Sequence, residues 1–411
     1  MISACGGGSS GDDNGECSIP DQNQFVYELM QEVYLYYDRL PAVNPNAYAS
    51  PDALLDDLIV SPDRFSYIAD QATQDNFFNE GTYIGFGFNW TALSANDIVI
   101  AFVFDDSSAG QAGLQRGDRI TALGGVSIAD LNANSSVSAT FNSIGEGESL
   151  LVTVLPLGAS ETTDVVLTNG LVTMNTVISE RILTSGSSTV GYMGLTSFLE
   201  PTKTELDETF SRFSEANIDE LVLDLRYNGG GRLTTAQLLS SLIAGPAADG
   251  ADTARIEYND KNTEFNQSFP FLSLVNRVGL NRLYVLTLGG TCSASELTIN
   301  AMDPVNIEVI TVGETTCGKP VGSDGFDFCG KTINPITFAV LNDLGQGDYF
   351  DGIAPVCFAE DDLDHDFADT NEGMLATALF HINNGQCPIS TRRLRSQHNT
   401  VTITDPMQMV Q

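Results

Sequence analysis

Two glycine- and threonine-rich segments carry residue types that could act together in catalysis. One reads GGTCSASE and places Ser293 at the start of a predicted helix, and the other, GETTCGKP at 313–320, contains Lys319. One predicted helix and the strand IEVITV separate them, a βαβ-sized spacing that can bring neighbouring strand ends together. A serine hydroxyl needs a base, and a desolvated lysine can serve because burial favours its neutral amine. The spacing therefore indicates nucleophilic catalysis by Ser293 with Lys319 as the base.

Both segments also admit other interpretations. Ser293 and Glu296 fit a capping box, in which the serine only begins a helix. GETTCGKP matches a phosphate-binding loop G-x-x-x-x-G-K-[ST] except at Pro320, where that loop needs a hydroxyl to hold Mg²⁺. The following VGSDGF does not begin the helix that a phosphate loop requires, so we expect no nucleotide binding.

A third strand end, LDLRYNGGGRL, follows the same plan of a buried strand and a sharp loop. Its glycines allow the backbone to approach a substrate closely and to offer N–H donors, although they also suit a loose turn. The N–H of Ala294, next to the candidate nucleophile, would point toward a developing oxyanion. Catalytic groups commonly lie at such strand ends in α/β sheets.

The composition excludes several other classes of function. The 411 residues include 54 acidic and 18 basic side chains, and the net charge of -36 repels nucleic acids and anionic membrane surfaces. The three histidines (365, 381 and 398) all lie in the C-terminal section, and no C-x-x-C pair occurs, so we expect no zinc site. A Ser–Lys mechanism needs no metal and no organic cofactor, and we expect neither. The acidic cluster EDDLDHDFAD at 360–369 lacks the pattern of a calcium loop and is predicted to be solvated surface.

The elements that must position these residues change character along the chain. Residues 20–80 are predicted to be helical, from the spacing of FVYELMQEVYLYY and the helix start Ser50-Pro51-Asp52. From about 82 the pattern is that of strands punctuated by glycine, and from about 174 strands alternate with helices, as in a largely parallel sheet. We therefore expect a multidomain α/β protein.

The strand-rich block resembles a PDZ domain. SSAGQAGLQRGDRITALGGVSI is similar to the helix, turn and strand of that fold, and the upstream GFGF (Gly85, Phe86, Gly87 and Phe88) resembles its carboxylate-binding loop. Glycines let consecutive N–H groups converge on an anion, and the phenylalanines are expected to line an apolar pocket beside it. Glycines in strands also mark bulges, which is the alternative for this loop.

Taken together, DLRYNGGG, SASE and GETTCGK resemble the signature set of the C-terminal processing (tail-specific) peptidases. Members of that family are serine proteases with a Ser–Lys dyad and usually a PDZ domain, and the similarity covers roughly residues 20–390. The resemblance implies Ser293 as nucleophile and Lys319 as general base. It also implies oxyanion-hole N–H groups from Ala294 and Gly230 (or Gly231, if the loop register shifts), and charged support residues, which are Asp224, Arg226 and Glu296.

Two hypotheses follow from departures and details of this match. We expect an Arg226–Glu296 pair to brace the serine loop. Some family members place a glutamine four residues after the lysine, where this chain has Ser323, a weak candidate for the third catalytic member.

Seven cysteines add constraints. Ile2-Ser3-Ala4-Cys5 resembles the end of a bacterial lipoprotein signal, which implies an exported, periplasmic or cell-envelope protein that is lipid-anchored at Cys5. The other six allow up to three disulfides in fifteen connectivities. If the dyad assembles, Cys292 and Cys317 could reach bonding distance. Cys317–Cys329 competes with that pair, and Cys357–Cys387 is a further one.

The predicted organisation is a tether at 1–16, a helical domain at 17–80, a PDZ domain at 81–173, a Ser–Lys peptidase domain at 174–390 and a polar tail at 391–411. The predicted function is a serine endopeptidase whose PDZ domain captures the free C-terminus of peptide or protein substrates. The rival is a catalytically silent peptide-binding scaffold with the same fold. We expect no nucleic-acid partner, and membrane contact only through the lipid anchor.

Overall fold

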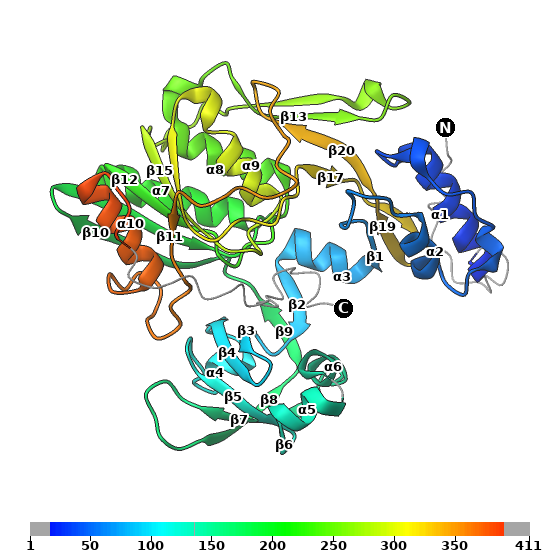
Figure 1. Ribbon diagram of the computed structural model, residues 1–411, viewed down its shortest axis with the longest axis horizontal. Coiled ribbons are helices and arrows are strands. Elements are labelled where there is room, and N and C mark those ends of the chain that lie inside the picture. Colours follow the sequence, from blue (N-terminus) through cyan, green and yellow to red (C-terminus); the bar gives the residue numbers. More distant parts are fainter. Residues whose placement is uncertain (1–16, 135, 390–411) are drawn as a thin grey trace. The chain divides into compact units, whose positions relative to one another are not determined.

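The structure is a computed structural model that describes residues 17–134 and 136–389 (Figure 1). The chain forms two compact units. The first comprises the described residues up to Ala72 together with Tyr258–Phe265 and Ser323–Phe338. The second comprises Thr73–Glu257, Asn266–Gly322 and the described residues from Ala339 onward. The fold is mixed α/β and multidomain, as the sequence predicts.

The first unit begins with two capped helices, α1 (Ile19–Val33) and α2 (Pro51–Leu58). The Ser50 hydroxyl accepts a hydrogen bond from the Ala53 N–H at 3.2 Å, and Pro51 occupies the first helical position, where a missing N–H costs nothing. Both helices bury an apolar face, consistent with the predicted periodicity. The buried residues of these faces include Val26, Leu29, Met30, Leu54, Leu55 and Leu58.

The predicted N-terminal helical segment is confirmed, but it also contains a strand. Residues Tyr67–Asp70 form strand β1, which pairs antiparallel with β19 (Lys331–Asn334), and β18 (Phe326–Phe328) completes a three-stranded sheet. A four-residue strand whose partner lies more than 260 residues later leaves no periodic signal in its own segment.

A PDZ-like sheet begins the second unit. Its strands are ordered β3-β4-β5-β7-β8, with β6 paired to β5, around a common apolar core. A separate ribbon of β2 (Thr82–Gly85) and β9 (Gly170–Thr173) carries the chain into and out of it. The remaining elements are β3 (Phe88–Ser94), β4 (Asp97–Val103), α4 (Ser108–Gln111), β5 (Arg119–Leu123), β6 (Val126–Ser127), α5 (Ile128–Asn134), α6 (Val137–Asn142), β7 (Ser149–Leu155) and β8 (Thr163–Thr168).

The main sheet of the second unit has the order β10-β11-β12-β15-β16-β21. Every neighbouring pair from β11 to β21 is parallel and only β10–β11 is antiparallel, which confirms the predicted parallel sheet. Its strands are β10 (Val177–Ser185), β11 (Ser188–Leu195), β12 (Glu220–Asp224), β15 (Arg282–Thr287), β16 (Glu308–Gly313) and β21 (Cys357–Phe358).

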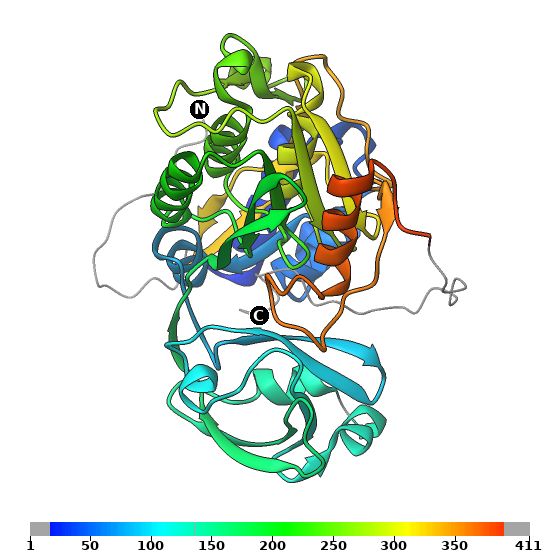
Figure 2. The ribbon, with the colours of Figure 1, turned by 90° about the vertical axis from the view of Figure 1, so that its left-hand side faces the viewer.

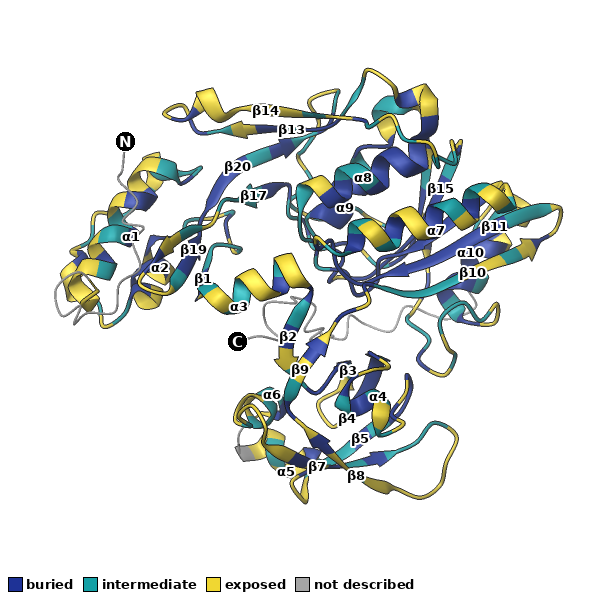
Figure 3. Cartoon of the chain, turned by 180° about the vertical axis from the view of Figure 1, so that it is seen from behind, coloured by how far each residue is buried: buried dark blue, intermediate teal, exposed yellow. Residues whose placement is uncertain are grey.

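Helices cover both faces of this sheet. Figure 2 shows α7 and α8 on one side and α10 on the other. The central strands and α8 are almost wholly buried, in contrast to the exposed outer faces of α7 and of the PDZ-like sheet (Figure 3). The helices are α7 (Thr202–Ala216), α8 (Leu233–Ala244), α9 (Ala294–Asn300) and α10 (Gly373–Asn384).

A further four-stranded sheet has the order β14-β13-β20-β17. Its strands are β13 (Asp252–Tyr258), β14 (Gln267–Pro270), β17 (Val321–Ser323) and β20 (Ile336–Leu341). The shorter helices are η1 (Tyr37–Arg39), η2 (Pro45–Ala47), α3 (Gln71–Asp75), the π-helix η3 (Asn76–Glu80), η4 (Gly245–Ala248), η5 (Thr263–Phe265) and η6 (Asp303–Val305). None of the helices in the described part of the chain combines the length and apolar character needed to cross a bilayer.

Candidate active site

Ser293 lies on a sharp turn between strand β15 and helix α9. Its backbone has φ 56° and ψ -111°, a conformation that costs a residue with a side chain about 1–3 kcal/mol. The Glu296 carboxylate accepts a hydrogen bond from the Ser293 N–H at 3.0 Å, so the glutamate half of the predicted capping box is formed. Nucleophilic serines of other α/β enzymes occupy similarly strained strand-to-helix turns. The turn therefore suits a nucleophile better than a simple helix cap.

The glycine loop after β12 lies directly against this turn. A Cβ placed on Gly230 would lie 2.8 Å from the Ser293 Cβ and 3.0 Å from the Ala294 nitrogen, and the φ of Gly230 is 109°. Only glycine fits there. The Asn228 carbonyl accepts hydrogen bonds from the Cys292 N–H at 3.1 Å and the Ser295 hydroxyl at 3.0 Å, which fixes the two loops together.

The two N–H groups predicted to form the oxyanion hole differ in their hydrogen bonding. The Ala294 N–H is the first of helix α9, one of the four positions that have no acceptor within a helix. The Gly230 N–H donates to the Asn228 side-chain oxygen at 2.9 Å, so it is engaged in this conformation.

Glu296 joins the serine turn to the lysine loop. It is fully buried, and one carboxylate oxygen accepts from the N–H groups of Ser293 at 3.0 Å and Lys319 at 2.8 Å. The other oxygen accepts from the Gly318 N–H at 2.8 Å and the Thr316 hydroxyl at 2.5 Å. Burial raises the pKa of Glu296 above its ordinary value, although these donors oppose the shift.

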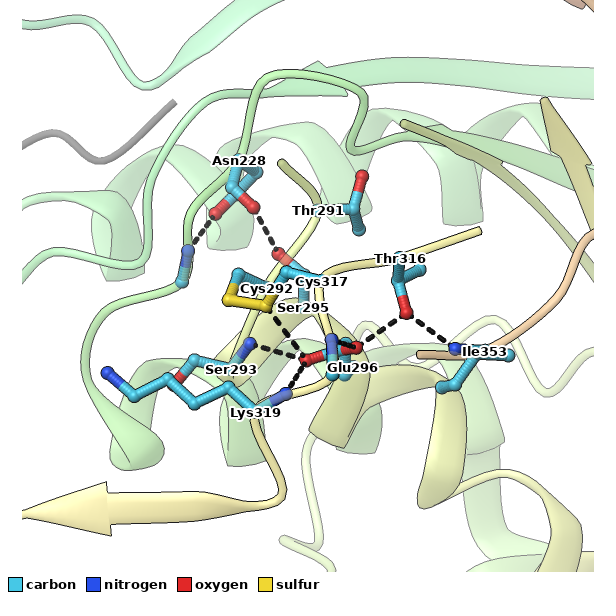
Figure 4. Close-up of a disulfide and its surroundings, with 12 residues drawn as sticks. Asn228, Thr291, Cys292, Ser293, Ser295, Glu296, Thr316, Cys317, Lys319 and Ile353 are labelled. Carbon is cyan, nitrogen blue, oxygen red and sulfur yellow. Dashed lines mark hydrogen bonds between the residues drawn. A yellow bond between two sulfur atoms is a disulfide. The ribbon is translucent and has the colours of Figure 1, made fainter. Parts of the chain in front are cut away.

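The structure thus brings Ser293 and Lys319 together, because their backbone amides share one carboxylate oxygen. Figure 4 shows both side chains extending from that point toward the same side. A second link is the disulfide between Cys292 and Cys317, whose Cα atoms are 5.2 Å apart. A third link is the hydrogen bond from the Cys317 N–H to the Thr291 carbonyl at 3.0 Å, so the two loops are held together beside the candidate dyad.

The predicted Arg226–Glu296 pair is wrong. The Arg226 guanidinium is buried and binds Asp224, Asp361 and Glu372, each at 2.8 Å. Asp224 also accepts from the Tyr192 hydroxyl at 2.7 Å. Glu296 is satisfied by backbone N–H groups and a hydroxyl, so it needs no arginine.

The prediction that 360–369 is only solvated surface is also wrong. The Asp361 side chain is 14% exposed and receives both Arg226 and Arg116, the latter from the PDZ-like region. Burial alone would raise the pKa of Asp361, but the two arginines outweigh it and lower that pKa to about 2. Asp361, Glu372 and Arg116 escape sequence reasoning because they belong to no recognisable motif near the serine.

Tyr227 lies at the centre of this charged group, next to the glycine loop. Its hydroxyl accepts a hydrogen bond from Arg116 at 2.8 Å and donates to Asp361. Burial raises the pKa of Tyr227 above its ordinary value, so it remains a neutral donor. The charged cluster therefore reaches the residue before Asn228, whose carbonyl joins the glycine loop to the serine turn.

The GFGF segment occupies the predicted place, between β2 and β3, but its phenylalanines do not line an open pocket. Phe86 and Phe88 are buried in the PDZ core and pack edge-on against Phe141 of α6. Gly87 has a φ of 88°, and a Cβ there would meet Ser107 at 1.9 Å, so glycine is required for packing. Gly85 ends strand β2.

The described cysteines form three disulfides, Cys17–Cys329, Cys292–Cys317 and Cys357–Cys387, and the competing Cys317–Cys329 pairing is wrong. Cys292, Glu296 and Cys317 place potential metal-ligand atoms within 4.8 Å of one another. The two sulfurs are bonded to each other and the carboxylate accepts four hydrogen bonds, so these ligand atoms already have partners.

Ser323, the weak candidate for a third catalytic member, ends strand β17. Cys5 and the polar tail fall outside the described residues.

This geometry defines an α/β peptidase fold with an inserted PDZ-like domain, and three family models agree. Peptidase S41 N-terminal domain matches 21–67, PDZ domain matches 77–154, and Peptidase family S41 matches 189–355. The chain belongs to peptidase family S41.

Named relatives and solved structures are consistent with that family. Carboxy-terminal processing protease CtpB of Bacillus subtilis (strain 168) is 25% identical over 260 residues, covering 62% of this chain and 51% of that protein. The chloroplastic C-terminal processing peptidase of Tetradesmus obliquus is 28% identical over 253 residues, covering 58% and 51%. The chain thus spans about half the length of these curated relatives.

A crystal structure from Bacteroides fragilis NCTC 9343, assigned to S41 proteases, has a TM-score of 0.72 at 26% identity and covers 88% of this chain and 97% of its own. The photosystem II D1 C-terminal processing protease, at 20% identity and a TM-score of 0.53 over 84% and 94%, shares the fold.

Proposed function

We propose that this chain is a serine endopeptidase in which Ser293 and Lys319 form a catalytic dyad. The observation that carries the proposal is the convergence of both backbone amides on the Glu296 carboxylate, with Ser293 on a strained turn at the start of α9. A binding scaffold has no evident use for such strain, whereas a nucleophile gains exposure from it.

In the proposed reaction, the Ser293 hydroxyl oxygen attacks the scissile carbonyl carbon while the Lys319 amine takes the hydroxyl proton. The Lys319 ammonium then returns that proton to the leaving amine, which frees the new N-terminus. Water, deprotonated by Lys319, hydrolyses the acyl-enzyme and restores the serine.

The oxyanion of the tetrahedral intermediate is assigned to the N–H groups of Ala294 and Gly230, with Gly231 as the alternative to Gly230. Because the Gly230 N–H now donates to Asn228, the proposal requires this peptide to turn when substrate binds. Glycine permits that rotation, since it has no side chain to restrict φ. The roles of Asp224 and Arg226 are to hold the strand end from which this loop departs.

The substrates are proposed to be peptides or proteins with a free C-terminus. The PDZ domain, matched over 77–154, would receive that terminus at Gly85–Phe88 through main-chain N–H groups. A bacterial cell-envelope location with a lipid at Cys5 remains part of the proposal and rests on the sequence motif alone. Mass spectrometry of Cys5 in the protein isolated from membranes tests it.

The decisive experiment compares cleavage of an unstructured protein with an apolar C-terminus by the native chain and by Lys319→Ala. We expect kcat to fall roughly 10²–10⁴-fold, the usual contribution of a general base. The matched control is Lys203→Ala, which removes a half-exposed lysine paired with Glu200 and should leave kcat unchanged.

A serine-directed fluorophosphonate separates the enzyme from its rival. Labelling of Ser293 in the native chain, lost in Ser293→Ala, is expected of the peptidase. A native chain that binds C-terminal peptides but neither cleaves nor is labelled would instead be the silent scaffold.

A further inference from the structure

The Cys292–Cys317 disulfide differs from the other two in what it joins. Cys292 immediately precedes Ser293, and Cys317 lies two residues before Lys319. By contrast, Cys17–Cys329 ties the start of α1 to the turn between β18 and β19. Cys357–Cys387 ties β21 to the segment after α10. Only the first of these bonds connects the two loops of the candidate dyad.

We propose that the Cys292–Cys317 disulfide is a redox-controlled positioning bond, which keeps the Ser293–Lys319 pair active when oxidised and inactivates it when reduced. The inference rests on the proposed function and adds to it a means of regulation. It predicts that a thiol reductant inhibits this peptidase by displacing the two loops relative to each other rather than by unfolding the protein.

The packing around the sulfurs gives the reason. The Cys317 sulfur lies 3.5 Å from the Glu296 oxygen that already accepts from the Ser293 and Lys319 N–H groups. Two thiols need more room than one disulfide, because sulfurs that are no longer bonded must separate to van der Waals contact. On one side, that separation is opposed by the filled Glu296 carboxylate. The loops must therefore shift, and they carry the two reacting groups with them.

Backbone hydrogen bonds of the two cysteines limit how far the loops can shift. The Cys292 N–H donates to the Asn228 carbonyl, and the Cys317 N–H donates at 3.0 Å to the carbonyl of Thr291, the residue before Cys292. Because this second bond joins the two loops directly, reduction shifts them relative to each other without parting them. A displacement of about 1 Å between catalytic groups can cost on the order of 10²-fold in rate. The Ser293 turn is the most responsive point, since relaxing its left-handed backbone is favourable.

The bond is also within reach of a reductant. Both cysteines are half-buried, like Ser293 and Lys319 beside them, whereas Glu296 is fully buried. A dithiol would reduce the bond in two steps. One of its thiolates attacks a cysteine sulfur and forms a mixed disulfide, and its second thiolate then releases that cysteine. Cys292 and Cys317 each gain one proton and one electron, and the dithiol becomes a cyclic disulfide.

The test measures kcat and KM of the oxidised native chain on the unstructured substrate during graded treatment with dithiothreitol. Maleimide labelling and peptide mapping identify which disulfides have opened at each point. We expect kcat to fall roughly 10- to 100-fold as Cys292 and Cys317 become labelled, KM to change little, and reoxidation to restore the rate. An unchanged kcat with this bond open would overturn the inference.

Two double variants give the matched comparison. Cys292→Ala with Cys317→Ala should show the low kcat without any reductant and should not respond to dithiothreitol. Cys357→Ala with Cys387→Ala should lose thermal stability but keep the native kcat and its response to the reductant. If the first pair destabilises the protein as judged by circular dichroism, the reversible titration of the native chain decides alone.

The proposed function and this inference fail in different ways. Without cleavage and without fluorophosphonate labelling of the oxidised native chain, the function itself fails. Cleavage that depends on Ser293 but persists after the bond is reduced leaves the function intact and removes the redox control. Activity that appears only after reduction would mean that the disulfide inhibits the enzyme, and this result would overturn the proposal.

Discussion

One buried carboxylate, Glu296, and a group of three others lie beside the candidate active site, and they are stabilised by opposite means. Glu296 accepts hydrogen bonds from three backbone N–H groups and one hydroxyl. Asp224, Asp361 and Glu372 surround Arg226, and Asp361 also binds Arg116. The first arrangement fixes main-chain positions, and the second balances charge.

The difference appears in the direction of each pKa shift. Burial raises the pKa of Glu296, since dipoles only partly replace the water it has lost. At Asp361 burial acts in the same direction, but two arginines reverse the result and lower the pKa to about 2. The dipole-bound carboxylate is therefore suited to holding loops in place, and the arginine cluster keeps Asp361 ionised to a lower pH than usual.

The largest effect is expected from Arg226→Met, which leaves three buried carboxylates short of a cation. We expect the free energy of unfolding to fall by about 3–5 kcal/mol, measured by urea denaturation. The matched control is Arg212→Met, because the Arg212–Glu180 pair lies at the surface with Arg212 51% exposed, and should cost no more than about 1 kcal/mol. Equal losses of stability in both variants would show that the buried ion pairs of Arg226 contribute no more than a surface ion pair.

Glu296→Gln tests the other group. One N–H acceptor becomes an NH₂ group that faces N–H donors, so we expect a loss of about 1–3 kcal/mol in stability. Because Ser293 and Lys319 lose their common anchor, kcat should also fall on the order of 10²-fold while KM stays similar. Glu308→Gln, at an exposed position that begins β16, is the control. A stability loss without a change in kcat would argue against a positioning role.

Stability against pH should distinguish the two groups by sign. The folded pKa of Asp361 is below its unfolded value, so its contribution is present above pH 4 and is lost as pH falls toward 2. This contribution is on the order of 2 kcal/mol. The raised pKa of Glu296 acts oppositely, favouring the folded state at low pH and losing that benefit as pH rises through the folded pKa.

Urea midpoints from pH 2 to 6 measure both slopes. Asp361→Asn should flatten the loss of stability below pH 4, and Glu296→Gln should leave that region unchanged. A native-like acid slope in Asp361→Asn would mean that other carboxylates control it.

The smallest effect is expected from Tyr227→Phe. It removes a hydroxyl that bonds Arg116 and Asp361 but leaves their direct 2.7 Å ion pair. We expect a cost of about 1–2 kcal/mol in the free energy of unfolding. A cost as large as that of Arg226→Met would contradict this ranking, because the tyrosine hydroxyl would then contribute as much as the arginine that three carboxylates share.

The sequence by itself determined the mixed α/β, multidomain fold class and the chemistry-bearing motifs. The alternation of strands and helices predicted the parallel sheet, and the three motifs placed Ser293, Lys319 and Gly230 at neighbouring strand ends. These signals are readable because periodicity, helix starts and glycine turns are properties of short segments. The same reasoning about strand ends offered Cys292–Cys317 as one of two alternatives for Cys317, and the structure has that pair.

Tertiary structure alone decided which side chains support the motifs that carry Ser293, Lys319 and Gly230. Arg226 pairs with Asp361 and Glu372, more than 130 residues away, instead of the expected Glu296. Strand β1 finds its partner at β19, and Cys17 bonds Cys329 across 312 residues. A buried charge or a strand edge takes whichever partner the folded chain brings near, and its own segment carries no record of that choice.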